Sequence, residues 1–128
     1  MRALLDTHLL IWHADDSPRL PPAAAEIIAT AEAELFFSAV SIWEIAIKTG
    51  LGRGDFEIDA AAFRDGLLEN GFEELPVDGR HGAAVAELPA LHADPFDRLL
   101  IAQARVEALD LLTCDAVVGR YPGALRLT

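Results

Sequence analysis

The sequence predicts an α/β fold in which a mostly parallel sheet is covered by helices on both faces. Short apolar runs suited to buried strands alternate with segments that carry the 3.6-residue periodicity of helices. The chain has 128 residues, of which 52% are hydrophobic and 24% charged. This length and composition indicate a single globular domain over residues 1–128, with a core of ordinary size.

Five short apolar runs are predicted to form the strands, at residues 2–5, 35–37, 73–77, 109–113 and 125–127. Pro76 weakens the third run, because proline cannot donate to a sheet ladder, and we therefore expect it near an edge of the sheet. Asp6, Ser38 and Asp115 closely follow three of the runs. In a parallel sheet these positions share the carboxyl edge, where ligands bind.

The helices are predicted from apolar periodicity and from end signals. They comprise a first helix with Leu9, Leu10 and Trp12, then residues 22–33, 39–49, 59–69 and 79–87, a helix that begins at Pro95, and a short one that follows Asp115 and ends near Gly119. Pro22 suits a first helical position, since that residue needs no amide hydrogen. Gly50 and Gly52 provide the stop of the third helix.

The third helix carries an acid whose role is open. Its apolar face is predicted to hold Val40, Trp43, Ala46 and Ile47. Glu44 lies beside that face. It is either the last member of a capping box that begins at Ser41 or a functional carboxylate.

Net charge and cysteine content limit the classes of function. The chain carries a formal net charge of −11, which counts against broad nonspecific binding of nucleic acid. A single cysteine, Cys114, suits a reducing cytoplasm. No apolar run reaches the roughly 18 residues of a membrane span, and the first residues lack the signature of an export signal.

Two carboxylates lie at the start of the helix that begins at Pro95. Asp94 is the predicted N-cap, and Asp97 falls in the first turn, where a negative charge favours the helix dipole. Capping alone explains both residues. For a simple crossover we expect this first turn at the edge opposite to Asp6, so the pattern leaves open whether Asp97 joins the other acids.

A cluster of Asp6, Glu44, Asp97 and Asp115 would need compensating charge. Each like-charged pair at about 4 Å costs on the order of 4 kcal/mol at an effective dielectric near 20. Lys48 alone cannot neutralise four acids. Oxygen-only ligands favour hard cations such as Mg²⁺ or Mn²⁺, which suit phosphoryl chemistry.

Four short motifs follow one another along nearly the whole chain. They are Asp6-Thr7-His8, Ser38-x-x-Ser41-x-Trp43-Glu44-Ile45, Asp94-Pro95-Phe96-Asp97-Arg98 and Thr113-x-Asp115. This series resembles the motifs of PIN-domain ribonucleases, specifically the VapC-type toxins of bacterial toxin–antitoxin systems. The resemblance implies a three-layer α/β/α sandwich and an Mg²⁺- or Mn²⁺-dependent endoribonuclease toxin that leaves a 5′-phosphate and a 3′-hydroxyl.

The resemblance also implies roles for individual residues and partners. It assigns the metal and the attacking water to Asp6, Glu44, Asp97 and Asp115. Supporting roles are implied for Thr7, Ser38 and Asp94. It further implies a homodimer and a small antitoxin that inhibits the enzyme.

Several other side chains have two possible roles each. Arg98, Lys48 and Arg53 are the expected phosphate contacts, although Arg98 could instead pair with a neighbouring acid. Trp12 and Trp43 could stack on bases, but core or interface positions are favoured for both. The histidines show no zinc-like spacing, and for His8 and His92 a packed or surface position is favoured over one in the cleft.

Two other functions remain open. A phosphate-responsive receiver module would share a parallel sheet with acids at its carboxyl edge. It would also need paired acids after the first strand and a late lysine, whereas Asp6 stands alone and the only lysine is Lys48. A catalytically silent PIN scaffold that binds a partner is the other alternative, and the complete set of acids argues against it.

Overall fold

One parallel sheet organises the molecule. The computed structural model describes residues 1–52 and 57–128. The strands are β1 (Arg2–Leu5), β2 (Glu34–Ser38), β3 (Glu73–Leu75), β4 (Asp110–Thr113) and β5 (Ala124–Arg126). In the described part of the chain they form one sheet in the order β3-β2-β1-β4-β5, and every neighbouring pair is parallel. The predicted parallel sheet and the edge position of β3 are confirmed.

Helices follow the strands in the predicted order. They are α1 (Thr7–Ala14), α2 (Pro22–Ala29), α3 (Ala39–Gly50), α4 (Ala60–Glu69), α5 (Gly79–Ala84) and α6 (Pro95–Glu107), with 3₁₀ turns at Val85–Glu87 and Val118–Arg120. Helix α2 is shorter than predicted. Thr30 leaves the helical conformation, and its hydroxyl donates to the Glu26 carbonyl over 2.9 Å.

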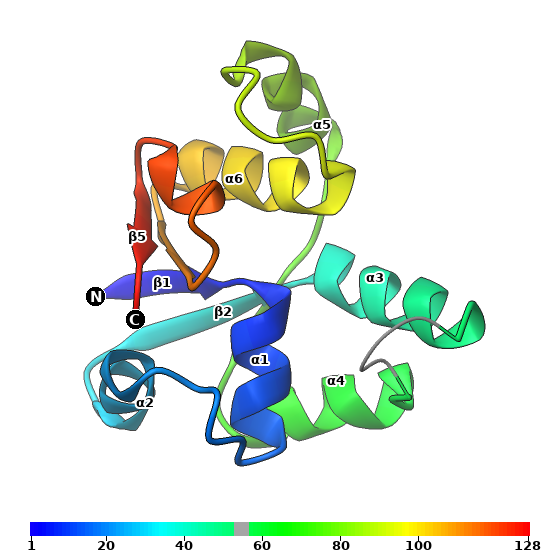
Figure 1. Ribbon diagram of the computed structural model, residues 1–128, viewed down its shortest axis with the longest axis vertical. Helices are drawn as coiled ribbons and strands as arrows, with labels where there is room; N and C mark the ends of the chain where they lie inside the picture. Colours follow the sequence, from blue (N-terminus) through cyan, green and yellow to red (C-terminus); the bar gives the residue numbers. More distant parts are fainter. Residues whose placement is uncertain (53–56) are drawn as a thin grey trace.

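The sheet lies between two layers of helices. Figure 1 shows α5 and α6 on one face and α1, α2 and α4 on the other. Successive residues of the central strand alternate between two apolar clusters, because strand side chains point to opposite faces. Leu4 packs in the cluster with the α6 side chains, whereas Leu5 packs with Leu9 and Leu10 of α1. The three-layer α/β/α sandwich is therefore confirmed.

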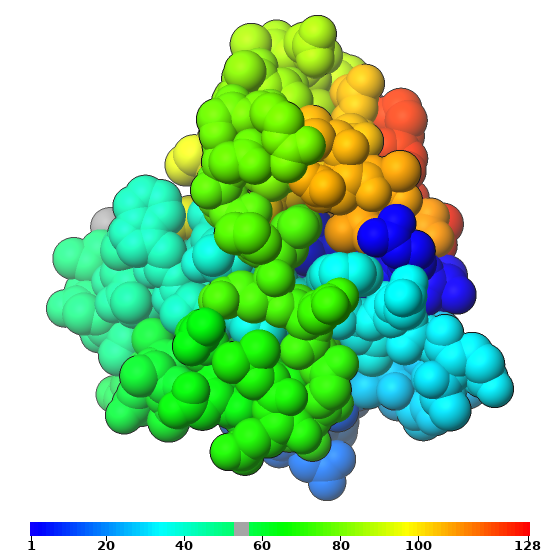
Figure 2. Space-filling view, turned by 180° about the vertical axis from the view of Figure 1, so that it is seen from behind, coloured from blue at the N-terminus to red at the C-terminus, as the bar shows by residue number. Residues whose placement is uncertain are grey.

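The layers are joined along one side of the molecule. Figure 2 shows this side from behind, with the chain from α4 through β3 to α5 (green to yellow-green) crossing it from one helical layer to the other.

No helix in residues 1–52 and 57–128 is both long and apolar enough to cross a membrane.

Helix α3 buries a different face from the one predicted. Trp43 is 59% exposed, and Ala46 is also exposed. The buried residues include two polar ones, Ser41 and Glu44, beside Ile45. The prediction from apolar periodicity was wrong here, because the polar side chains of Ser41 and Glu44 are hydrogen-bonded inside the protein.

The direction of α6 corrects a second expectation. Only Ala108 and Leu109 separate its last residue from β4, and the Leu109 amide donates to the Ala104 carbonyl. The end of α6 therefore lies at the start of β4, and its first turn lies at the carboxyl edge. A crossover helix runs antiparallel to the strands, so the expectation that Asp97 lies at the opposite edge was wrong.

Candidate metal centre

A cleft of about 430 Å³ at the carboxyl edge of the sheet is lined by all four predicted acids. Each acid comes from a different element. Asp6 follows β1, Glu44 belongs to α3, Asp97 lies in the first turn of α6 and Asp115 follows β4. The cleft lies beside the central strand, where the order of the sheet reverses, which is the usual ligand site of an open parallel sheet.

Asp6 is held by hydrogen bonds to both carboxylate oxygens. Oδ1 accepts from the Leu9 amide over 3.0 Å, which makes Asp6 the N-cap of α1, and Oδ2 accepts from the Thr113 hydroxyl over 2.5 Å. Only 7% of Asp6 is exposed. Burial raises the pKa of its carboxyl, and the bonds from Thr113 and Leu9 partly oppose that rise. A cation in the cleft would favour the charged form.

Glu44 is fixed by partners on α1 and α3. Its Oε1 accepts from the Thr7 hydroxyl over 2.7 Å, and that hydroxyl is 2.9 Å from the Ser41 hydroxyl. Oε2 pairs with the Lys48 ammonium at 2.5 Å. The capping-box interpretation of Glu44 is wrong, because the N-cap of α3 is Ser38 and the Glu44 side chain bonds to Thr7 of α1 and to Lys48 of its own helix instead. A buried glutamate is thereby held at the cleft.

Ser38 makes a different set of contacts from Thr7. Its hydroxyl is completely buried, caps the Val40 amide and donates to Gln103 Oε1 over 2.5 Å. Gln103 in turn donates to the Pro76 carbonyl. Ser38 thus joins β2 to α6 and the loop after β3, and its contacts do not include the four acids.

Asp97 and Asp115 lie close together, and they share a neighbour, His92. Atoms of these three side chains all lie within 4.8 Å of one another. Asp115 Oδ1 accepts from the Val117 amide over 2.7 Å and from the Val118 amide over 3.0 Å. Asp97 Oδ2 lies 2.7 Å from His92 Nε2.

The environment of Asp97 disfavours its charge. Burial raises the pKa of this carboxyl to about 6, the bond from His92 opposes the rise, and the nearby charges of Asp94 and Glu44 add to it. Asp94 is the predicted N-cap, since its Oδ1 accepts from the Phe96 and Asp97 amides over 2.8 and 3.1 Å. The first turn of α6 therefore presents Asp97 to the cleft, while Asp94 caps the start of the helix.

The expected phosphate contacts lie in three different settings. Lys48 lines the cleft and is paired with Glu44. Arg98 donates to the carbonyls of Val85, Pro89 and His92 and to the Tyr121 hydroxyl. Arg53 lies outside the described residues.

Sequence reasoning missed the contributions of His92 and Thr113. His8, His92 and Trp12 line the cleft, in contrast to the favoured readings for the two histidines. The spacing of His92 from Asp97 matches no metal-binding motif. The position of His92 depends on the conformation of the loop before α6, which the sequence pattern does not give. Thr113 had a usable signal, because its place two residues before Asp115 puts its hydroxyl at the carboxyl edge.

The donor set fits a hard divalent cation. Carboxylate oxygens prevail among the described groups of the cleft, and Lys48 is the one lysine or arginine among its described lining residues. Oxygen ligands suit Mg²⁺ and Mn²⁺, and such a charge would compensate the mutual repulsion of the acids. These residues can therefore hold a metal ion.

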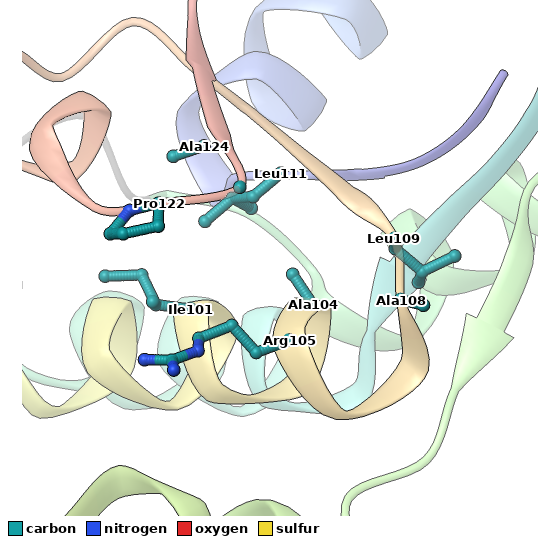
Figure 3. Close-up of a pocket in the computed structure, with 9 residues that line it drawn as sticks. Ile101, Ala104, Arg105, Ala108, Leu109, Leu111, Pro122 and Ala124 are labelled. Carbon is teal, nitrogen blue, oxygen red and sulfur yellow. The ribbon is translucent and has the colours of Figure 1, made fainter. Parts of the chain in front are cut away.

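A second pocket differs in character. It has a volume of about 180 Å³ and lies between the end of α6 and the start of β5. Figure 3 shows Ile101 and Ala104 of α6 facing Pro122 and Leu111, with Arg105 beside them. This pocket contains no carboxylate among its lining residues and is not a metal site.

Comparisons with known proteins agree with this fold. The crystal structure of VapBC2 from Rickettsia felis, bound to a DNA fragment from its promoter, matches with a TM-score of 0.71 at 16% identity, over 100% of both chains. A toxin–antitoxin complex from Klebsiella pneumoniae matches with a TM-score of 0.66 at 16% identity, over 96% of this chain and 95% of that one. FitAcB from Neisseria gonorrhoeae matches with a TM-score of 0.63 at 19% identity, over 91% and 89%.

Sequence comparisons give the family directly. A search of curated proteins returned no match. The family model described as PIN domain matches residues 3–124, which include all four acids of the cleft. The chain belongs to the PIN domain family.

Proposed function

We propose that this protein is a metal-dependent endoribonuclease toxin that hydrolyses RNA phosphodiester bonds. The observation that carries the proposal is the convergence of Asp6, Glu44, Asp97 and Asp115 from four elements on one cleft. Bringing these acids together, two of them buried, is costly, and an ordinary structural role would not require it. Membership of the PIN family supports the assignment of nuclease chemistry.

The four carboxylates would hold Mg²⁺ or Mn²⁺. When bound, such an ion activates water and stabilises charge on the phosphate during in-line displacement. Asp6 is fixed by Thr113 and the start of α1, so its geometry is set before substrate binds. Thr7 performs the same task for Glu44. By analogy with the family, we propose a 5′-phosphate and a 3′-hydroxyl as the products.

Substrate contacts would come from the rim of the cleft. Lys48 lies beside Glu44 and can reach a phosphate near the acids. The guanidinium of Arg98 already donates to three carbonyls and a hydroxyl. We therefore propose Lys48 as the main phosphate contact and Arg98 as a secondary one. Arg53 remains a further proposed contact.

We also propose an inhibitory antitoxin and a homodimer as partners. The structural neighbour from Klebsiella pneumoniae is a toxin–antitoxin complex, which supports the first partner. An antitoxin with a basic side chain would suit the acidic cleft, because the charge on both would be compensated. The cytoplasm is the proposed site of action, where RNA and a reduced Cys114 would be found.

The alternative functions have less support. A receiver module requires paired acids after the first strand and a late lysine, and the match to the PIN family gives it no support. A silent scaffold would not need the ordered acids of the cleft.

The proposal is tested by RNA cleavage with Mn²⁺, with and without EDTA. We expect cleavage that EDTA abolishes, and a loss of at least about a hundredfold in Asp6→Asn and in Asp97→Asn, more than outer-shell changes typically cost. Asp65→Asn, on the exposed surface of α4, is the control and should keep full activity.

Three results would contradict the proposal. They are cleavage without metal, full activity in both cleft variants, and phosphorylation by acetyl phosphate in place of RNA cleavage. If RNA cleavage is observed, sequencing the 5′ ends of RNA fragments after brief expression of the protein would identify the substrate.

A further inference from the structure

His92 contacts the candidate metal centre from outside the set of acids. It lies in the loop before α6, five residues ahead of Asp97, and its Nε2 is 2.7 Å from Asp97 Oδ2. Its side chain is 20% exposed. An atom of its ring, one of Asp97 and one of Asp115 lie within 4.8 Å of one another. A single side chain thus bonds one acid of the centre and adjoins a second.

The backbone of His92 is clamped by two residues from other parts of the chain. Its amide donates to the Tyr121 hydroxyl over 3.0 Å, and its carbonyl accepts from Arg98 over 3.3 Å. The same Tyr121 hydroxyl accepts from the Leu91 amide over 3.2 Å and donates to the Pro89 carbonyl over 2.9 Å. Arg98 also donates to the Pro89 carbonyl.

This clamp is rigid because its central group is inside the protein. Tyr121 is 1% exposed and packs in the apolar cluster with the α6 side chains. Arg98 lies one residue after Asp97, so α6 holds the loop from the same turn that carries the acid. The loop, the acid and the histidine therefore form one hydrogen-bonded unit.

We propose that His92 is a positioning residue of the metal centre: its Nε2–H holds Asp97 Oδ2, and the second Asp97 oxygen remains to bind the ion. This inference rests on the proposed function. Side chains that bond the ligands of a metal orient them, and their loss commonly weakens metal binding. A carboxylate oxygen that accepts one bond leaves the other oxygen with its full capacity as a ligand.

The geometry favours positioning over direct coordination by His92. A separation of 2.7 Å between nitrogen and oxygen is that of a hydrogen bond. When Asp97 is the carboxylate that a metal ion requires, both of its oxygens are acceptors, so the proton of this bond lies on Nε2. A protonated ring nitrogen has no lone pair for a metal ion. The same nitrogen cannot serve both purposes at once.

The test is the affinity of the intact protein for Mn²⁺, measured from the electron paramagnetic resonance signal of the free ion. We expect His92→Ala to weaken binding about tenfold, at the lower end of losses of this kind. His92→Gln should recover most of the affinity, because its amide can donate to Asp97. His13→Ala removes a histidine of α1 that lies outside the lining of the cleft, and it should leave the affinity unchanged.

Two results would overturn the inference while the metal centre stands. One is an unchanged Mn²⁺ affinity in His92→Ala. The other is a ¹⁴N coupling to bound Mn²⁺ that disappears in His92→Ala, since this would make His92 a direct ligand. Tyr121→Phe gives an independent check, because loss of its hydroxyl releases the His92 amide and should weaken Mn²⁺ binding in folded protein.

Failure of the proposed function would look different. In that case the unchanged protein would bind no Mn²⁺, or its binding would survive Asp97→Asn. Either result removes the metal centre, and the positioning role with it. Circular dichroism of each variant ensures that the comparison is made between folded proteins.

Discussion

The two ends of α6 differ in the contacts that their side chains make. At its start, Asp94 caps the helix, Asp97 faces the acidic cleft and Arg98 holds the preceding loop. At its end, Ile101 and Ala104 line an apolar pocket, and the helix closes at Ala108 in a left-handed conformation with a φ of 56°. Polar bonds surround the cleft at the first end, whereas mostly apolar side chains line the pocket at the second.

This difference separates a functional end from a stabilising one. The first end keeps a carboxylate partly buried with a raised pKa, which costs stability whenever the group is charged. The second end contains no charged group besides the exposed Arg105 among its described pocket residues. We expect changes at the start of α6 to alter pH dependence and metal binding, and changes at its end to alter stability alone.

The largest effect is expected in the pH dependence of stability without metal. The pKa of Asp97 is raised from 3.8 to about 6 in the folded protein. The contribution of this group to stability is fully present below about pH 4 and is lost as pH rises through about 6. Between pH 4 and 7 the loss amounts to at most about 3 kcal/mol, since one pKa unit corresponds to about 1.4 kcal/mol.

Chemical denaturation in EDTA at several pH values measures this effect. Asp97→Asn should remove that part of the pH dependence, and Asp65→Asn on α4 should retain it. Asp6 adds to the pH dependence of stability in the same direction in the unchanged protein and in both variants, because burial also raises its pKa. An identical pH profile for Asp97→Asn and the unchanged protein would contradict the prediction.

The arginines at the two ends of α6 offer a matched pair of smaller effect. Arg98→Ala removes bonds to three carbonyls and a hydroxyl, and should lower the free energy of unfolding by about 2 kcal/mol. Arg105→Ala removes an exposed side chain and should stay within about 0.5 kcal/mol of the unchanged protein. Urea titrations of both variants test the contrast, and equal losses would refute it.

The smallest effect is expected at the end of α6. Ala108→Gly relieves the left-handed backbone at this position and should raise the free energy of unfolding by up to about 1 kcal/mol. Its Mn²⁺ affinity should equal that of the unchanged protein. A loss of stability, measured in the same titrations, would show that Ala108 is not strained.

Most of the fold was predictable because its signals are local. Apolar runs of strand length, separated by helical periodicity, give the order of elements, and Pro95 with Asp94 marks the start of α6. Pro76 correctly placed β3 at an edge. Each of these signals depends on neighbours within a few residues, so the sequence carries it without knowledge of the tertiary structure.

Apart from the shortened α2, the failures lie near the cleft, where local patterns are overruled. Helix α3 buries Ser41 and Glu44 and exposes Trp43, in contrast to its apolar periodicity. Thr7 and Lys48 satisfy Glu44, and the benefit of these contacts is invisible in the periodicity of α3 alone. Such conflicts between local pattern and fold are expected at functional sites.

The sequence by itself determined the class of fold, the order of the elements and the acids most suited to chemistry. Tertiary structure alone decided that Asp97 lies at the carboxyl edge with Asp6, that Glu44 is buried, and that His92 bonds Asp97. Periodicity records which face of an element is apolar, but a site depends on distances between elements far apart in the chain. Those distances follow from the direction of α6 and from the loop held by Tyr121 and Arg98, and no local pattern contains them.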